Sequence, residues 1–180
     1  MERLKLATVW LGGCSGCHMS FLDLDEWLLE LVKLADIVYS PVVDTKEFPE
    51  GVDVTLVEGA VANEENLEML LKIRKRSKVV ISFGDCAITG NVTSLRNPLG
   101  SKSKVLERSY VELADANKGF PGEPGILPVL IDRVEPLHAI VPIDYYLPGC
   151  PPSAPEIRKV LEAITSGEQP ELQGRELKFG

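Results

Sequence analysis

The chain has little positive charge and no long apolar run. Its 180 residues include 19 Lys and Arg against 27 Asp and Glu, which gives a net charge of −8. DNA, RNA and anionic membranes favour basic surfaces, so this balance argues against all three as partners. No apolar run approaches the roughly 20 residues that a membrane-spanning helix needs. We therefore expect neither nucleic-acid binding nor membrane insertion.

Targeting signals and nucleotide motifs are also lacking. Residues 1–5 run straight into a strand-like segment, with neither the apolar region of a signal peptide nor a twin-arginine pair. We expect a cytoplasmic protein, and structural disulfides are uncommon in that compartment. The sequence contains neither G-x-x-x-x-G-K-[ST] nor G-x-G-x-x-G, so no motif supports nucleotide binding. No residue specifically calls for a flavin in this chain.

The composition, with 44% hydrophobic and 26% charged residues, is that of an ordinary globular protein. We expect a single domain over residues 1–180, with a core of about residues 1–168 and a tail at 169–180. Apolar runs predict strands at residues 6–11, 36–43, 52–57, 78–83 and 144–147, and a short extended piece at 126–131.

Helical spacing predicts three main helices, at residues 17–35, after a cap at Asn63, and after a capping box at Ser153. Residues 95–125 read as a long loop with a short helix around 105–114. Strands that alternate with helices predict an α/β fold built on a doubly wound parallel sheet. Ligands of such sheets bind beyond the carboxyl ends of the strands.

The four cysteines, Cys14, Cys17, Cys86 and Cys150, all follow predicted strands closely. In a parallel sheet those strand ends lie on one edge, so cysteines far apart in the sequence become neighbours. Four thiolates are the usual ligand set of an iron–sulfur cluster. The flanking glycines, such as Gly84 and Gly149, let the backbone approach the sulfurs. We therefore predict one iron–sulfur cluster, of the [4Fe–4S] type, on these four cysteines.

Three alternative roles of the cysteines stay open at this point. They could be buried residues without a shared role, because free cysteine packs as a small hydrophobe. They could form a structural zinc site, although such sites usually use two CxxC pairs. Cys14 and Cys17 could also act alone as a redox dithiol, which would leave Cys86 and Cys150 without a role.

Three further residues lie near the predicted strand ends. Glu58 closes the third strand and is a candidate cluster neighbour, proton relay or transient iron ligand, or simply an acceptor for N–H groups of the turn. His18 follows Cys17; it could contact a sulfur, but an exposed position at a helix start is the simpler expectation. His138 is expected to be structural or to lie at an interface.

The cysteine segments together resemble the small subunit of [NiFe]-hydrogenases. The matching motifs are Trp-Leu-Gly-Gly-Cys-Ser-Gly-Cys at 10–17, Val-Glu-Gly-Ala at 57–60, Gly-Asp-Cys at 84–86 and Leu-Pro-Gly-Cys-Pro-Pro at 147–152. The segments 18–23 and 61–66 are similar to the short small subunit of cytoplasmic, bidirectional NAD(P)-linked hydrogenases. This resemblance covers nearly the whole chain.

The resemblance implies a flavodoxin-like fold and a role in electron transfer. In that family the matching residues, Cys14, Cys17, Cys86 and Cys150, bind the proximal [4Fe–4S] cluster, and the residue matching Glu58 lies close to it. The resemblance also implies a large-subunit partner with the nickel–iron centre, and iron–sulfur and flavin diaphorase subunits with FMN and NAD(P).

The sequence also departs from two relatives. The longer respiratory small subunits carry further cysteines for two more clusters and a twin-arginine leader, which this sequence lacks. Electrons would therefore pass to a cluster on a partner chain. The related complex I subunit, a quinone-reducing alternative, carries adjacent paired cysteines in place of the CxxC at Cys14–Cys17, and that pair is absent here.

Overall fold

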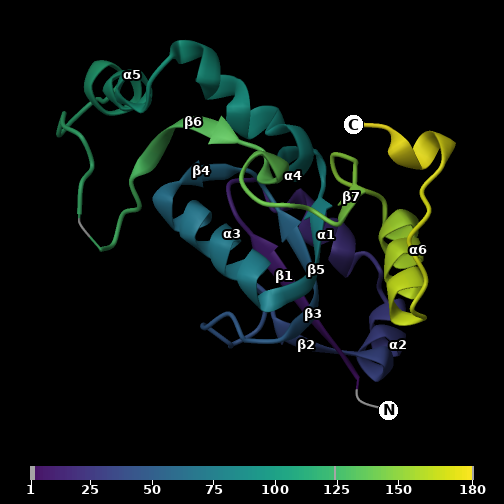
Figure 1. Ribbon diagram of the computed structural model, residues 1–180. Helices are drawn as coiled ribbons and strands as arrows, with labels where there is room; N and C mark the ends of the chain where they lie inside the picture. Colours follow the sequence, from purple (N-terminus) through teal and green to yellow (C-terminus); the bar gives the residue numbers. More distant parts are fainter. Residues whose placement is uncertain (1–2, 124, 180) are drawn as a thin grey trace.

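The computed structural model describes residues 3–123 and 125–179, and a five-stranded parallel sheet runs through its centre (Figure 1). The strand order is β2-β1-β3-β5-β7, and every neighbouring pair is parallel. Counted along this sheet alone, the order is 2-1-3-4-5, as in flavodoxin. This confirms the predicted doubly wound α/β fold. The strands are β1 (Leu4–Trp10), β2 (Ala35–Tyr39), β3 (Val52–Glu58), β5 (Ser77–Phe83) and β7 (Tyr145–Leu147).

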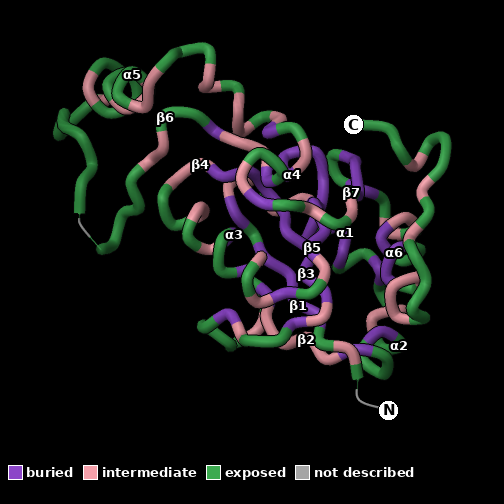
Figure 2. Tube along the Cα trace, in the orientation of Figure 1, coloured by how far each residue is buried: buried purple, intermediate pink, exposed green. Residues whose placement is uncertain are grey.

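Helices cover both faces of this sheet. Alternate strand residues point to opposite faces, so Leu56 and Val57 of β3 belong to two different cores. Leu56 packs with α1, α2 and α6, and Val57 packs with α3 and α4. Figure 2 shows the sheet as the buried centre of the molecule. The helices are α1 (Gly16–Leu22), α2 (Trp27–Leu34), α3 (Glu64–Arg76), α4 (Asp85–Thr89), α5 (Lys102–Glu107) and α6 (Ala154–Thr165).

The predicted helix caps are confirmed. The Asn63 side chain accepts a hydrogen bond from the Asn66 N–H at 2.8 Å, which satisfies one free donor at the start of α3. At the start of α6 the Ser153 N–H donates to Glu156 Oε2 at 2.9 Å. Local side-chain bonds therefore fix where both helices begin.

The expected helix at residues 17–35 is wrong as a single element. It is two helices, because α1 ends at Leu22 and α2 begins at Trp27. Asp25 between them has φ +48°, a left-handed conformation that a continuous right-handed helix cannot contain. The apolar spacing continues across the break, which is why the sequence alone does not reveal it.

The long segment after α4 contains more regular structure than expected. It holds a 3₁₀ helix (Asn91–Leu99), then α5 and a π-helical turn (Arg108–Glu112). Beyond them β6 (Leu130–Glu135) pairs antiparallel with the short β4 (Val61–Asn63). Neither β4 nor this pairing was predicted. The part around α5 projects from the sheet in Figure 1 and is mostly exposed in Figure 2.

The tail predicted at residues 169–180 docks beside α6 over its described part. Leu172 packs against the core, and Lys159 Nζ of α6 lies 2.7 Å from Glu176 Oε2 in a short 3₁₀ helix (Gly174–Leu177). Within residues 3–123 and 125–179, no helix combines the length and apolar character required to cross a membrane.

Candidate metal centre

Four strands of the sheet end in register, and this row of ends positions the candidate site. Trp10 of β1 is the register partner of Glu58 of β3, which is the partner of Phe83 of β5, and Phe83 is the partner of Leu147 of β7. The segments that carry the cysteines begin directly after three of these residues, Trp10, Phe83 and Leu147. The predicted convergence at one edge of the sheet is therefore present.

All four cysteines are free and line one small cavity of about 50 Å³. Cys14 precedes α1 and Cys17 lies in it, whereas Cys86 lies in α4 and Cys150 in the turn after β7. Cys17 and Cys86 are buried, and Cys14 and Cys150 are exposed. The site therefore has a closed side in the protein and an open side at the surface.

The two buried cysteines lie where a lone thiolate is disfavoured. Burial, reinforced by the Glu58 carboxylate, raises the pKa of the Cys17 thiol far above its usual range. Burial also raises the pKa of Cys86, although the nearby Thr93 hydroxyl and Val92 backbone oppose this. Positive charge in the cavity would be needed to keep both sulfurs ionised, and metal ions supply such charge.

Gly84 provides the close approach that the glycine pattern predicted. Its φ is +84°, and a Cβ on it would overlap Cys17 Sγ. Only glycine therefore fits between the β5 turn and this sulfur. At Cys14, the Gly16 N–H donates to Sγ at 3.4 Å. The cavity is shaped around sulfur atoms.

Glu58 caps the helix that carries Cys17. Its carboxylate accepts hydrogen bonds from the N–H groups of Cys17 at 3.4 Å and His18 at 3.0 Å, and it also contacts His18 Nδ1. Glu58 thus accepts backbone N–H groups, as one expectation held, but these belong to the start of α1 and not to the turn after β3. The expectation of an exposed His18 is wrong, because only 6% of the residue is exposed and Glu58 holds its ring inside.

Asp85 was not singled out by the sequence, yet it joins two cysteine loops. Its carboxylate accepts a hydrogen bond from the Gly149 N–H at 2.7 Å, and its own N–H donates to the Gly149 carbonyl at 3.0 Å. Ser20 Oγ of α1 donates to the Pro152 carbonyl at 2.5 Å. A signal for Asp85 was available, since it stands between a turn glycine and Cys86.

Asn91 was also missed. It begins the 3₁₀ helix after α4, and its Nδ2 lies 3.4 Å from Cys150 Sγ as a hydrogen-bond donor. Two residues later Thr93 Oγ1 donates to the Gly12 carbonyl at 2.9 Å. Nothing in the local sequence marks these contacts, because they join segments that meet only in the folded chain.

The residues fit a thiolate-bound cluster. Four free cysteines share one cavity, and Gly84 leaves space for the Cys17 sulfur. Among the described residues, no group of three or more His, Cys, Asp and Glu side chains is placed to hold a single metal ion. The thiolates of a cluster bind different irons, so this last finding concerns a single-ion site.

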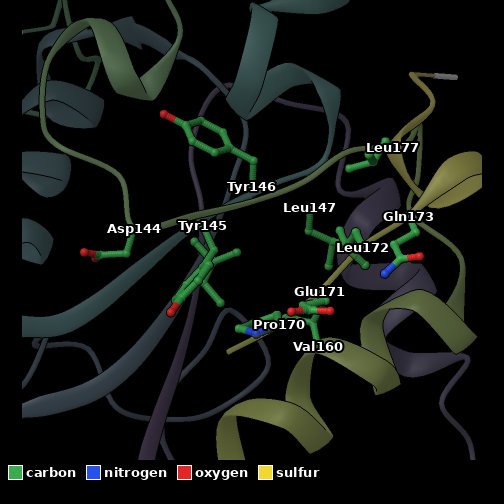
Figure 3. A pocket seen from close by; sticks show the side chains of 11 residues that line it. Asp144, Tyr145, Tyr146, Leu147, Val160, Pro170, Glu171, Leu172, Gln173 and Leu177 are labelled. Atoms are coloured by element: carbon green, nitrogen blue, oxygen red, sulfur yellow. The ribbon is translucent and has the colours of Figure 1, made fainter. Parts of the chain in front are cut away.

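A second cavity, of about 430 Å³, lies under the tail, and no cysteine lines it (Figure 3). Most of its lining is apolar or aromatic, from β7, α6 and the tail. Nearby His138 is exposed, with its ring centroid 6.2 Å from that of Tyr146. The cavity is lined by Ile81, Asp144, Tyr145, Tyr146, Leu147, Val160, Pro170, Glu171, Leu172, Gln173 and Leu177.

Comparison with known proteins assigns the chain to a family. Residues 14–164 match the family described as NADH ubiquinone oxidoreductase, 20 Kd subunit. The chain belongs to this family. The matched region begins at Cys14 and contains all four cysteines and Glu58, so the family relationship includes the candidate site.

Two relatives of the chain are subunits of hydrogenases. The chain is 41% identical to the G subunit of an F420-non-reducing hydrogenase from Methanothermobacter marburgensis, over 98% of the chain and 58% of that protein. The chain thus spans little more than half the length of this relative. It is 40% identical to the delta subunit of the NAD-reducing hydrogenase HoxS of Cupriavidus necator, over 92% of the chain and 80% of that protein.

The fold has a close counterpart among solved structures. A chain of an NAD+-reducing [NiFe]-hydrogenase in the H2-reduced state superposes with a TM-score of 0.93 at 36% sequence identity. The match covers 99% of this chain and all of the other. The similarity therefore includes the projecting segment around α5 as well as the sheet.

Proposed function

We propose that this chain is the electron-transfer small subunit of a [NiFe]-hydrogenase complex that couples H2 to NAD(P). In this proposal Cys14, Cys17, Cys86 and Cys150 hold one [4Fe–4S] cluster, the one proximal to a nickel–iron centre on a large-subunit partner. Iron–sulfur and flavin diaphorase subunits, carrying FMN and NAD(P), complete the path. The complex works in the cytoplasm, where four free thiols are usual.

One observation carries the proposal: cysteines that follow three different strands line the same cavity at the edge of a parallel sheet. The names of the relatives support the choice of enzyme, since both are hydrogenase subunits and one is NAD-reducing. The similarity to an NAD+-reducing [NiFe]-hydrogenase chain over its full length supports the same choice.

The residues of this chain would bind, orient and shield the group. When bound, a [4Fe–4S] cluster supplies one-electron transfer. Glu58 fixes the backbone at Cys17, and Asp85 fixes the turn that carries Cys150. Burial of Cys17 and Cys86 keeps water from one side, and the exposed Cys14 and Cys150 face the side from which a partner can exchange electrons.

Metal analysis of the anaerobically purified chain tests the ligand assignment. We expect about four irons and about four sulfides per chain, and no zinc. One zinc per chain with no iron would overturn the assignment and favour a zinc-binding interaction module.

The substitution Cys86→Ser tests the electron path in the assembled complex. We expect lower cluster occupancy and loss of H2-dependent NAD(P) reduction, because a serine hydroxyl is a poor replacement for a thiolate. NADH–dye activity of the partner flavin should remain, which controls for assembly of the diaphorase. Loss of both activities together would contradict the proposed path. NADH–quinone activity without H2 oxidation would favour the complex I-like alternative, which belongs to the same family.

A further inference from the structure

The start of the 3₁₀ helix Asn91–Leu99 lies beside two of the four cysteines. Asn91 Nδ2 donates to Cys150 Sγ at 3.4 Å. The Val92 backbone lies near Cys86, which is buried, and favours the ionised form of that thiol. This helix therefore contacts one exposed and one buried cysteine, although it carries no cysteine itself.

The backbone at Asn91 is held in an uncommon conformation. Its φ is +33°, directly after Gly90 at φ +82°. Asn tolerates the left-handed region better than most residues, but the conformation still has a cost. Because of this turn, the helix starts beside the cysteine loops, and Thr93 Oγ1 anchors it to the Gly12 carbonyl at 2.9 Å.

Hydrogen bonds to sulfur are one of the factors that set the reduction potential of an iron–sulfur group. Reduction adds one negative charge, part of which resides on the sulfurs. A donor stabilises the more negative state by the larger amount, so it raises the potential. The Asn91 amide is neutral, which means that it supplies this effect without adding charge to the site.

We propose that Asn91 is a positioning and tuning residue, whose amide raises the reduction potential of the group bound at Cys150. The inference rests on the proposed function, because it assumes a cluster on the four cysteines. It goes beyond that function by assigning control of the potential to a residue outside the ligand set.

Two variants separate the hydrogen bond from charge. Asn91→Gly removes the donor, leaves the charge unchanged and relieves the left-handed backbone. Asn91→Asp keeps the size of the side chain, removes the N–H donor and places a carboxylate beside the sulfur. A matched control is Asn117→Gly, since Asn117 also has a left-handed backbone, at φ +53°, and is exposed in the projecting segment.

The measurement is a redox titration of the full chain, purified anaerobically and followed by electron paramagnetic resonance, after iron and sulfide analysis of each variant. For Asn91→Gly we expect the equilibrium constant for one-electron reduction to fall about 2- to 10-fold, the range for one net hydrogen bond. A tenfold change corresponds to about 59 mV. For Asn91→Asp we expect a larger fall, because the charge effect adds to the lost donor. Asn117→Gly should leave the potential unchanged.

The outcomes distinguish this inference from the proposed function. Wild-type chain without iron and sulfide would overturn the proposed function itself. Loaded variants with the wild-type potential would overturn only the role of Asn91. A fall in Asn117→Gly as large as that in Asn91→Gly would also overturn it, since the shift would then not depend on the contact with Cys150.

Discussion

The carboxylate of Asp85 accepts a hydrogen bond from the backbone N–H of Gly149, at 2.7 Å, and thereby ties the turn after β5 to the turn after β7. The Asp85 N–H completes the pair through the Gly149 carbonyl. These residues immediately precede Cys86 and Cys150. The Asp85 side chain thus adds a buried link between two cysteines from distant parts of the chain, beside the backbone bonds that join β5 to β7.

Replacing Asp85 by alanine should loosen both turns. A buried hydrogen bond to a charged group contributes about 1.5–3 kcal/mol, so we expect a loss of that order in the free energy of unfolding, measured by urea denaturation of the full chain. Iron content should fall as well. Asp85→Asn retains an acceptor oxygen and should lie between Asp85→Ala and the wild type. Equal stability of Asp85→Ala and wild type would contradict this role.

Adding one methyl group at Gly84 should disrupt the candidate site. In Gly84→Ala the Cβ would overlap Cys17 Sγ, so the sulfur must move. Gly100→Ala is a control for a methyl group added at a positive φ, here +86°, in open space, because the nearest atom is Lys104 Nζ at 4.0 Å. The ψ angles differ, at 166° for Gly84 and −21° for Gly100, so Gly84→Ala carries the larger backbone strain in addition to the overlap. We expect Gly84→Ala alone to lose most of its bound iron, as measured by metal analysis; an equal loss in both variants would contradict a specific role of Gly84.

Glu58→Gln should weaken the cap on α1. Both carboxylate oxygens accept a backbone N–H, and a glutamine would turn one NH2 group toward a donor. The resulting unsatisfied N–H should cost about 1–3 kcal/mol in the free energy of unfolding, measured by urea denaturation of the full chain. Glu156→Gln is the control, since the Ser153 N–H that it serves lies at the exposed start of α6 and can bond to water. Comparable losses in the two variants would show that burial of Glu58 is unimportant.

Asp53, which lies outside the candidate site, should make the free energy of unfolding depend on pH. Partial burial opposes ionisation, but hydrogen bonds from the Lys5 N–H and the Lys78 side chain outweigh it and lower the pKa of Asp53 below 3.8. A carboxyl whose pKa is lower in the folded state stabilises the fold at pH values above its pKa in the unfolded chain. This stabilisation is lost as the pH falls through the pKa of the folded state.

The variant Asp53→Asn should therefore lose about 0.2–1 kcal/mol at pH 7, because the ion pair is partly exposed. The difference from wild type should vanish at a pH below the folded pKa, where the carboxyl is protonated. Urea denaturation at both pH values checks this, with the exposed Asp115→Asn as control. A difference that is the same at both pH values would contradict the assignment to the ionised form.

The sheet and the meeting of the cysteines were predictable because both follow from local patterns. Apolar runs such as that of β5 indicate buried strands, and parallel strands bring their carboxyl ends together. The break between α1 and α2 was not predictable, since the left-handed Asp25 lies within a continuous helical spacing. The pairing of β4 with β6 was missed because β4 has only three residues and the extended piece expected at 126–131 overlaps β6 only at Leu130 and Ile131.

The contacts of His18 and Asn91 near the cysteines could be identified only in the folded chain. His18 is buried because Glu58, from a strand far along the sequence, accepts from its backbone N–H and holds its ring. Asn91 reaches Cys150 only because the turn after α4 lies against the turn after β7. Such contacts depend on register and backbone angles that no short motif encodes.

The four cysteines come from three connections of one sheet, and this has a consequence for the life of the protein in the cell. A group bound to all four would cross-link the segments of Cys14 and Cys17, Cys86 and Cys150. It would thereby close long loops that are open in the unfolded chain. The free energy of unfolding would then be highest when iron is available. In iron shortage the empty chain would open more readily and become the preferred target of proteases, so that the abundance of the protein would follow the supply of the metal.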